Sequence, residues 1–345
     1  MKTFVVASTR PSAGKTGIIL GLAKCCKQRC GYIKPLGDRL LYRKKRLWDY
    51  DASLVTGVLG LDDISDEMTL GFEHSKLRYI YDEESLKGKL NETAQTLGRH
   101  SDILLVEGSR DISYGASINL DSISVTRMLD AELIFILSGA EDSVIDDLVF
   151  LKRYIYPEKI RIRGVIINKV RDLEDFRTTH QGSIEKMGIN VLGILPFKPE
   201  LTHITVDYLS EALFAKVLAG EGGLNNFITN IFVGDMSTDA ACRHPIFSTG
   251  KKLIIASGDR SDLILASLDS DTSAIVVTNN IPPPANIIAK AADRKIPLLL
   301  VPHDTFKTAK LVDDMEPLLT KTSTAKVELL EGMVRDHVRI GDLFA

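Results

Sequence analysis

Short apolar runs and longer amphipathic stretches alternate over the first two-thirds of the chain. The apolar runs are rich in β-branched residues and predict strands, whereas the apolar positions between them recur at helical spacing. Strands that alternate with helices build parallel sheets covered on both faces, so the pattern predicts a doubly wound α/β domain. We predict strands at residues 3–7, 31–34, 102–107, 132–137, 163–168 and 190–194, and helices at residues 15–27, 51–58, 83–99, 122–129, 143–156 and 173–187.

A second, smaller α/β alternation follows a segment rich in glycine and asparagine. This composition is typical of a domain boundary, which we place at residues 218–226, after a predicted helix at 206–217. The predicted strands of this part are at 230–233, 252–257, 274–278 and 297–301, and its helices at 238–242, 261–267, 284–293 and 305–316. The predicted domains are residues 1–217 and 224–320, with a helical tail at 321–345.

The pattern of apolar residues in the tail predicts one amphipathic helix over residues 322–345. Its apolar side chains recur at helical spacing and define a face that is suited to packing on a partner. They are Val327, Leu330, Val334 and Val338.

Charge and composition narrow the classes of function. The 345 residues include 43 basic and 46 acidic side chains, so bulk charge does not draw the protein to nucleic acid or to an anionic membrane. Its apolar runs are far shorter than the roughly 20 residues of a membrane-spanning helix, and we expect no secretory signal, since residues 1–7 lack the pattern of one. We expect a cytoplasmic protein without nucleic-acid or membrane partners. Four cysteines are too few for a disulfide scaffold, so reduced thiols are expected.

The most informative motif follows the first predicted strand. Residues 8–16 read Ser-Thr-Arg-Pro-Ser-Ala-Gly-Lys-Thr and lead into a predicted helix, although the usual phosphate-loop pattern has glycine in place of Thr9. Unpaired backbone N–H groups and the helix dipole favour a phosphate at such a position. We expect Lys15 to bridge the β- and γ-phosphates and Thr16 to coordinate Mg²⁺. The predicted nucleotide-binding residues of this loop are Thr9, Ser12, Ala13, Gly14, Lys15 and Thr16.

Two acidic residues are candidate ligands of the Mg²⁺ that accompanies a triphosphate. Glu107 ends an apolar strand at the carboxyl edge of the predicted sheet, where ligands bind in open α/β folds. A solvated glutamate at a strand end is the alternative for this residue. Asp51 begins a predicted helix and is either a second metal ligand or a helix cap.

Two further polar residues lie at the ends of predicted strands. Lys34 could neutralise a γ-phosphate or an attacking carboxylate, and a surface lysine is the alternative. Asn168 can offer both a donor and an acceptor to an adenine edge. We predict Lys15 and Lys34 as the catalytic residues and Asn168 as a nucleotide-binding residue.

These residues together resemble a known family. The loop at 9–16, Lys34-Pro35, Asp51, Glu107-Gly108 and the segment 168–170 have the order and roughly the spacing of the dethiobiotin synthetase superfamily, over residues 1–215. Residues 224–319 resemble a DRTGG domain through Val-Gly-Asp-Met at 233–236 and Gly-Asp-Arg-Ser-Asp at 258–262. The pairing is similar to the amino-terminal regulatory region of long phosphotransacetylases without their catalytic domain. This resemblance implies a regulatory protein that binds ATP and Mg²⁺ and forms a homodimer or a larger homo-oligomer.

The chain departs from the family pattern at residues that bear on activity. Ser-Arg-Asp at 109–111 stands where dethiobiotin synthetases have a glycine-rich segment that helps to hold substrate. Arg10 replaces an acidic residue of those synthetases, and it either reaches the nucleotide of a partner subunit or stays within its own subunit. Asp259 and Arg260 either bind a small anionic metabolite or cap a helix.

Three functions are open on this basis. A nucleotide-binding regulatory protein with at most slow ATP hydrolysis is favoured, because no Cys or Ser nucleophile is paired with His in a recognisable signature. The alternative is an ATP-dependent synthetase that activates a carboxylate. A structural interaction protein with a vestigial loop is the third possibility.

Overall fold

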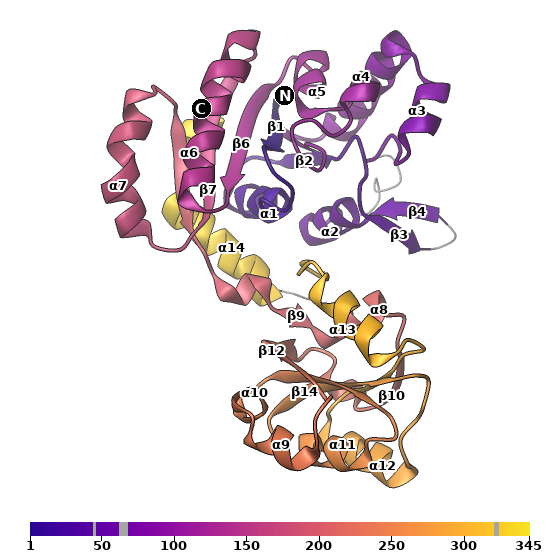
Figure 1. Cartoon of the computed structure of the whole chain (residues 1–345). Coiled ribbons are helices and arrows are strands. Elements are labelled where there is room, and N and C mark those ends of the chain that lie inside the picture. Colours follow the sequence, from indigo (N-terminus) through magenta and orange to yellow (C-terminus); the bar gives the residue numbers. More distant parts are fainter. Residues whose placement is uncertain (44–45, 62–67, 321–323) are drawn as a thin grey trace. The chain divides into compact units, whose positions relative to one another are not determined.

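The computed structural model describes residues 1–43, 46–61, 68–320 and 324–345 (Figure 1). The chain forms two compact units. The first comprises Met1–Lys198 and Lys321–Ala345, and the second comprises Pro199–Thr320. Each unit has a mostly parallel sheet with helices packed on it, which confirms the predicted fold class.

Six parallel strands form the sheet of the first unit in the order β2-β5-β1-β6-β7-β8. From β1 the chain first moves to β2, and it later passes back across β1 as it runs from β5 to β6. Ligands of open α/β sheets bind at the carboxyl ends of the strands where the direction reverses in this way. The strands are β1 (Lys2–Ser8), β2 (Cys30–Ile33), β5 (Ile103–Glu107), β6 (Glu132–Ser138), β7 (Ile162–Val170) and β8 (Val191–Pro196).

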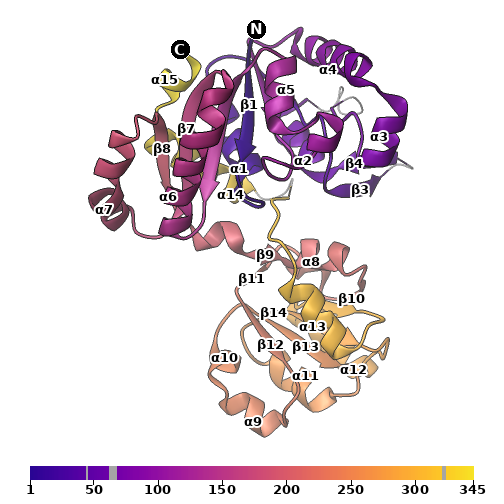
Figure 2. The ribbon, with the colours of Figure 1, turned by 45° about the horizontal axis from the view of Figure 1, so that its top comes forward.

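Right-handed crossovers distribute the helices of the first unit over both faces of its sheet. α1 and α2 lie on one face, and α4 to α7 lie on the other (Figure 2). The central strands are therefore buried on both sides, which explains why residues 4–7 and 103–106 are continuous apolar runs. The helices are α1 (Lys15–Cys25), α2 (Tyr50–Leu59), α3 (His74–Ile80), α4 (Glu83–Gly98), α5 (Ser122–Met128), α6 (Glu141–Phe150) and α7 (Leu173–Lys186).

The C-terminal segment packs within the first unit. α14 (Thr324–His337) lies against α1, where the thiol of Cys25 donates a hydrogen bond to the carbonyl of Glu331 at 3.3 Å. α15 (Ile340–Phe344) lies beside β8 (Figure 2). The prediction of one continuous helix is wrong, because the helix breaks where Val338 bridges to β8 and the Arg339 amide donates to Leu192. Residues 321–323 of the predicted tail lie outside the described residues.

The main sheet of the second unit has five strands in the order β10-β15-β14-β13-β12, and within it only β10 is antiparallel to its neighbour. Apolar side chains of α8 and α13 pack on one face of the sheet, and those of α9 to α12 pack on the other. The strands are β10 (Lys216–Ala219), β12 (Asn230–Val233), β13 (Lys252–Ser257), β14 (Thr272–Thr278) and β15 (Leu298–Leu300). The helices are α8 (Val206–Ala212), α9 (Thr238–Arg243), α10 (Pro245–Ser248), α11 (Ser261–Leu268), α12 (Ala285–Arg294) and α13 (Thr305–Asp313).

The structure divides the chain earlier than the predicted boundary at residues 218–226. The helix predicted over 206–217 ends at Ala212, because Phe214 has a left-handed backbone with a φ of 50° and β10 follows it. β10 then pairs with β15, so both the helix and the predicted boundary belong to the second unit. A two-residue pair, β9 (Ile204–Thr205) with β11 (Phe227–Ile228), completes this region.

Two general expectations can be compared with the described residues. None of their helices is both long and apolar enough to cross a bilayer. All four cysteines are free thiols, as the low cysteine content predicts.

Candidate nucleotide site

The loop between β1 and α1 is held open by the end of β7. Gly14 caps α1 with a φ of 95°, and a Cβ atom at this position would lie 2.5 Å from Nδ2 of Asn168. Glycine alone satisfies both constraints without strain. The Asn168 amide donates to the carbonyl of Ala13 at 2.9 Å, and the Lys169 ammonium donates to that of Ser12 at 2.7 Å. These contacts fix the backbone of the loop just before the helix begins.

Lys15 is the first residue of α1, and its side chain turns back toward β1. Its ammonium donates to Oγ of Ser8 at 2.8 Å and to the carbonyl of Arg110 at 3.0 Å. The side chain is buried, and burial lowers the pKa of Lys15. A cation is thus held at the N-terminus of α1, where the helix dipole already favours an anion.

Glu107 lies beside Thr16, as the sequence predicts for the carboxyl edge of the sheet. The register pairs Val6 of β1 with Glu107 of β5, which brings the carboxylate level with the start of α1. The Thr16 hydroxyl donates to Oε1 of Glu107 at 2.8 Å, and the Tyr32 hydroxyl donates to Oε2 at 2.7 Å. Glu107 is buried, and burial raises its pKa to about 7.

The pair of Thr16 and Glu107 fits a magnesium ion by its chemistry. Both residues offer oxygen atoms, the ligands that Mg²⁺ prefers, and the two atoms are already within 2.8 Å of each other. The adjacent hydroxyls are neutral hydrogen-bond donors to the buried Glu107 carboxylate, so a cation bound there would offset part of the cost of its burial.

Lys34 lies among three carboxylates that follow β2. Its ammonium forms ion pairs with Asp38 at 2.5 Å, Asp49 at 3.1 Å and Asp51 at 2.7 Å. Burial disfavours the charged form of Lys34. The negative charges of the nearby carboxylates, Asp51 above all, outweigh this effect and raise the pKa of Lys34. Arg39 adds a second ion pair to Asp51 at 2.9 Å. The metal-binding role of Asp51 and the catalytic role of Lys34 stay predictions, and both residues are already ion-paired in this structure.

The cap of α2 is Asp49 rather than Asp51. The Asp49 carboxylate accepts hydrogen bonds from the backbone amides of Ala52, Asp38 and Arg39. The cap alternative for Asp51 is therefore wrong. Burial of Asp51 alone would raise its pKa, but Lys34 and Arg39 lower it, so Asp51 is held as a carboxylate.

Arg10 is bound within its own chain. Its Nε and Nη2 atoms donate to the two carboxylate oxygens of Asp147 in α6, at 2.9 and 3.1 Å. The Thr9 hydroxyl donates to the same carboxylate at 2.7 Å. The hydrogen bond and the charge of Asp147 raise the pKa of Arg10. A role of Arg10 at the nucleotide of a partner subunit stays a prediction, and it would require Arg10 to leave Asp147.

Several contributors to this site carried no signal in the sequence. Tyr32 is an interior strand residue, and Asp147 is one of several acidic residues in α6. Ser8 and Lys169 lie within the motifs at residues 8–16 and 168–170, but nothing in the sequence indicated their contacts with the loop. The contacts of Tyr32, Asp147 and Lys169 join residues far apart in the sequence, so no local pattern indicates them.

In the second unit, Arg260 supports the connection that follows β12. Its guanidinium donates to the carbonyls of Gly234 at 3.3 Å and Met236 at 2.9 Å. Arg260 occupies the cap position of α11, but its side chain makes no cap hydrogen bond. A metabolite site at Asp259 and Arg260 stays a prediction.

The sequence matches two described families, one for each unit. Residues 2–205 match the AAA domain, and residues 208–315 match the DRTGG domain. The first match covers more than half of the chain. The chain belongs to the AAA domain family. It is a dethiobiotin synthetase-like P-loop domain followed by a DRTGG domain, which confirms the resemblance given by the sequence motifs.

One curated relative, an enzyme, aligns with nearly all of this chain. Phosphate acetyltransferase of Nitratidesulfovibrio vulgaris is 22% identical over 98% of this chain and 50% of the relative. Cobyric acid synthase of Geobacillus kaustophilus is 27% identical over 39% of this chain and 28% of the relative. The chain thus spans about half of the first relative and less of the second.

One solved structure is similar to part of this chain. It contains the CBS and DRTGG domains of the regulatory region of Clostridium perfringens pyrophosphatase, complexed with the activator diadenosine tetraphosphate. It is 18% identical, covers 39% of this chain and 61% of that chain, and has a TM-score of 0.29.

Proposed function

We propose that this protein binds Mg-ATP in the loop between β1 and α1 and acts as a regulatory protein. The observation that carries the proposal is the group formed by Lys15, Thr16 and Glu107, where a buried cation, a hydroxyl and a buried carboxylate meet at the start of a helix. Unpaired amides and the dipole of that helix add to its attraction for phosphate.

Each residue of the group has a separate task in this proposal. Lys15 would exchange its hydrogen bonds to Ser8 and Arg110 for bonds to phosphate oxygens. Thr16 and Glu107 would hold Mg²⁺, which neutralises phosphate charge when it is bound. Asn168 would act by fixing the loop through the Ala13 carbonyl, in addition to any contact with the base.

Slow hydrolysis follows from what surrounds these residues. Phosphoryl transfer needs charged groups placed around the γ-phosphate. The nearest candidates, Arg10 and Lys34, are already ion-paired with Asp147 and with the carboxylates around Asp51. Nucleotide binding with little turnover suits a regulatory role, as does the similarity to half of a phosphate acetyltransferase.

The alternative is a synthetase that phosphorylates a carboxylate and then condenses it with nitrogen. In that mechanism Lys34 would meet the substrate, which requires it to leave Asp38, Asp49 and Asp51. Phosphate release that depends on an added small carboxylic acid would favour this function over the regulatory one.

Thermal unfolding in the presence of nucleotide tests the proposal. Mg-ATP at 100 times its dissociation constant should stabilise the wild-type protein by about 2.7 kcal/mol, because it binds only the folded state. Lys15→Ala should abolish this shift while it leaves the melting temperature without nucleotide nearly unchanged. An equal shift in both proteins, or none in the wild type, would refute nucleotide binding at this loop.

A further inference from the structure

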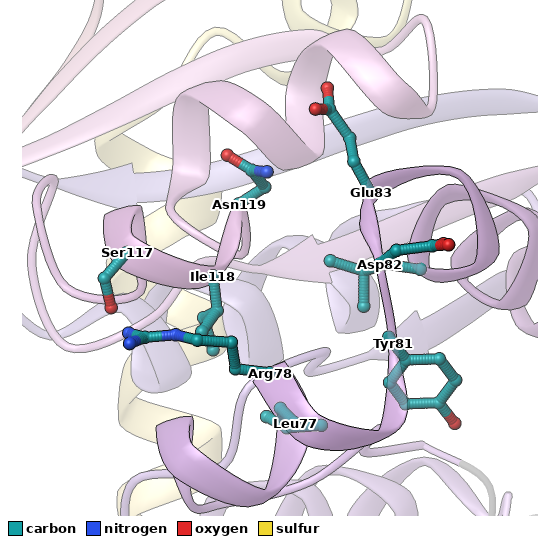
Figure 3. Close-up of a pocket in the computed structure, with 9 residues that line it drawn as sticks. Leu77, Arg78, Tyr81, Asp82, Glu83, Ser117, Ile118 and Asn119 are labelled. Atoms are coloured by element: carbon teal, nitrogen blue, oxygen red, sulfur yellow. The ribbon is translucent and has the colours of Figure 1, made fainter.

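A pocket outside the nucleotide site lies between α3, α4 and the short helix η2 (Ala116–Ile118). Its volume is about 270 Å³, slightly below the range of roughly 300–1,000 Å³ that is usual for small-molecule sites. The pocket therefore suits a ligand smaller than a nucleotide. Figure 3 shows the residues that line it, which are Leu77, Arg78, Tyr81, Asp82, Glu83, Leu86, Ser117, Ile118 and Asn119.

The floor of the pocket is aliphatic. Leu77 of α3, Leu86 of α4 and Ile118 of η2 are each buried, with at most 7% of their surface exposed. Each comes from a different element, so the apolar surface depends on all three elements together. A short hydrocarbon chain that covers this floor would bind favourably, because apolar surface of both partners is removed from water.

The rim of the pocket carries one cation whose charge is not neutralised. Among the residues that the structure describes, Arg78 forms no ion pair or hydrogen bond through its guanidinium. In Figure 3 the guanidinium extends toward the side of the pocket where the Ser117 hydroxyl lies. A planar guanidinium with a neighbouring hydroxyl is suited to bind a carboxylate through two parallel hydrogen bonds.

The acidic residues of the pocket do not compete for Arg78. Asp82 caps α4 by accepting a hydrogen bond from the Ser85 amide, and the Asp82 amide in turn donates one to the Ser85 hydroxyl. In Figure 3 the carboxylates of Asp82 and Glu83 point away from the guanidinium. The side of the pocket that faces Arg78 is therefore positive, and the opposite side is acidic.

We propose that this pocket binds a small organic acid, with its carboxylate on Arg78 and Ser117 and its aliphatic part on Leu77, Leu86 and Ile118. The site is separate from the nucleotide loop, but one connection joins them. η2 lies in the segment that follows Glu107, and the Arg110 carbonyl of that segment accepts a hydrogen bond from Lys15. The ring of Tyr114, in the same segment, packs edge-on against the ring of His74 in α3, with 4.9 Å between the ring centroids.

Saturation-transfer NMR with sodium butyrate tests the proposal on the full chain without nucleotide. Butyrate should show transfer from the wild-type protein, and butyramide, its uncharged counterpart of the same shape, should show at least fivefold less. Arg78→Gln should reduce the butyrate signal to the level of butyramide. Arg78 is exposed, so this substitution should leave the fold intact.

Two controls make the outcome decisive. Arg99→Gln removes another exposed arginine, at the end of α4, and should leave the butyrate signal unchanged. Ser117→Trp should reduce it by filling the mouth of the pocket from an exposed position. Equal saturation-transfer signals for butyrate and butyramide would overturn the proposal. An undiminished butyrate signal with the Arg78→Gln protein would also overturn it. Because no nucleotide is present, the result does not depend on whether the loop binds ATP.

Discussion

Burial controls the charges of several ionisable residues in the first unit. Glu107 and Lys34 are both buried at the carboxyl edge of the sheet, yet their pKa values respond to different surroundings. Burial raises the pKa of Glu107 to about 7, whereas the carboxylates around Lys34 hold it in its charged form. A bound cation would therefore benefit Glu107, and Lys34 already has the charges it needs.

A buried lysine outside the site gives a pH-dependent prediction. Burial lowers the pKa of Lys326 in α14 to about 8, against a model-peptide value of about 10.4 in the unfolded chain. The unfolded chain holds more protons between these values, so the free energy of unfolding should rise with pH from about 8 to about 10.4. At about 1.36 kcal/mol for each pH unit, the rise is at most about 3 kcal/mol.

Denaturant unfolding of Lys326→Met measures this effect. The variant should be more stable than the wild type at pH 7, and the difference should shrink as the pH rises toward 10. Lys24→Met, at an exposed position of α1, should follow the wild type at every pH. A constant difference between Lys326→Met and wild type over this range would contradict the assignment.

The residues of the site were predictable to different degrees. The loop and Glu107 follow from strand ends and helix starts, which the sequence pattern locates. The base contact of Asn168 stays a prediction, and its amide also holds the Ala13 carbonyl, which the sequence did not indicate. That contact crosses from β7 to the loop after β1, and no local pattern encodes it. For the same reason the ion pairs of Arg10 and Lys34 could not be read from the sequence.

At the scale of elements, the packing of α14 on α1 ties the end of the chain to the helix that starts at the loop. A Cβ added at Gly21 would lie 2.5 Å from Cγ2 of Val334 and 3.0 Å from the Leu330 carbonyl oxygen. The absence of a side chain at Gly21 lets the two helices approach closely. Gly21 is therefore a determinant of how the C-terminal segment packs.

A double-mutant cycle tests this contact. Gly21→Ala should destabilise the protein by about 1–3 kcal/mol through overpacking, and Val334→Ala should also destabilise it. The double variant should be destabilised by less than the sum of the two single effects, because removing Cγ2 of Val334 relieves part of the clash with the new Cβ atom. Gly88→Ala is the matched control, since a Cβ there meets nothing within 4 Å. Strict additivity of the two substitutions would show that the contact does not form in solution.

Most elements of both sheets were predicted within a few residues, because their strands are short apolar runs. Three elements of the first unit were not predicted, the strands β3 (Leu40–Arg43) and β4 (Arg46–Asp49) and the short helix α3. β3 and β4 pair only with each other, outside the main sheet, and α3 has seven residues of which only Leu77 is buried. None of the three carries the periodic apolar pattern on which the predictions rest.

At the scale of the whole molecule, the second unit is an insertion in the first. The chain leaves the first unit at Lys198, after β8, and returns to it with α14, which packs on α1 and β8. The returning segment thus packs on α1, the helix whose first residue is Lys15.

Calorimetric titration of the full chain with ATP tests the central claim most directly. The account predicts saturable binding with Mg²⁺, binding weakened at least tenfold when EDTA removes the metal, and a comparable loss in Lys15→Ala. Lys24→Ala, on the exposed side of the same helix, should bind like the wild type. Binding that is insensitive to both EDTA and Lys15→Ala would contradict the account, because the phosphates would then lie somewhere other than the loop that opens α1.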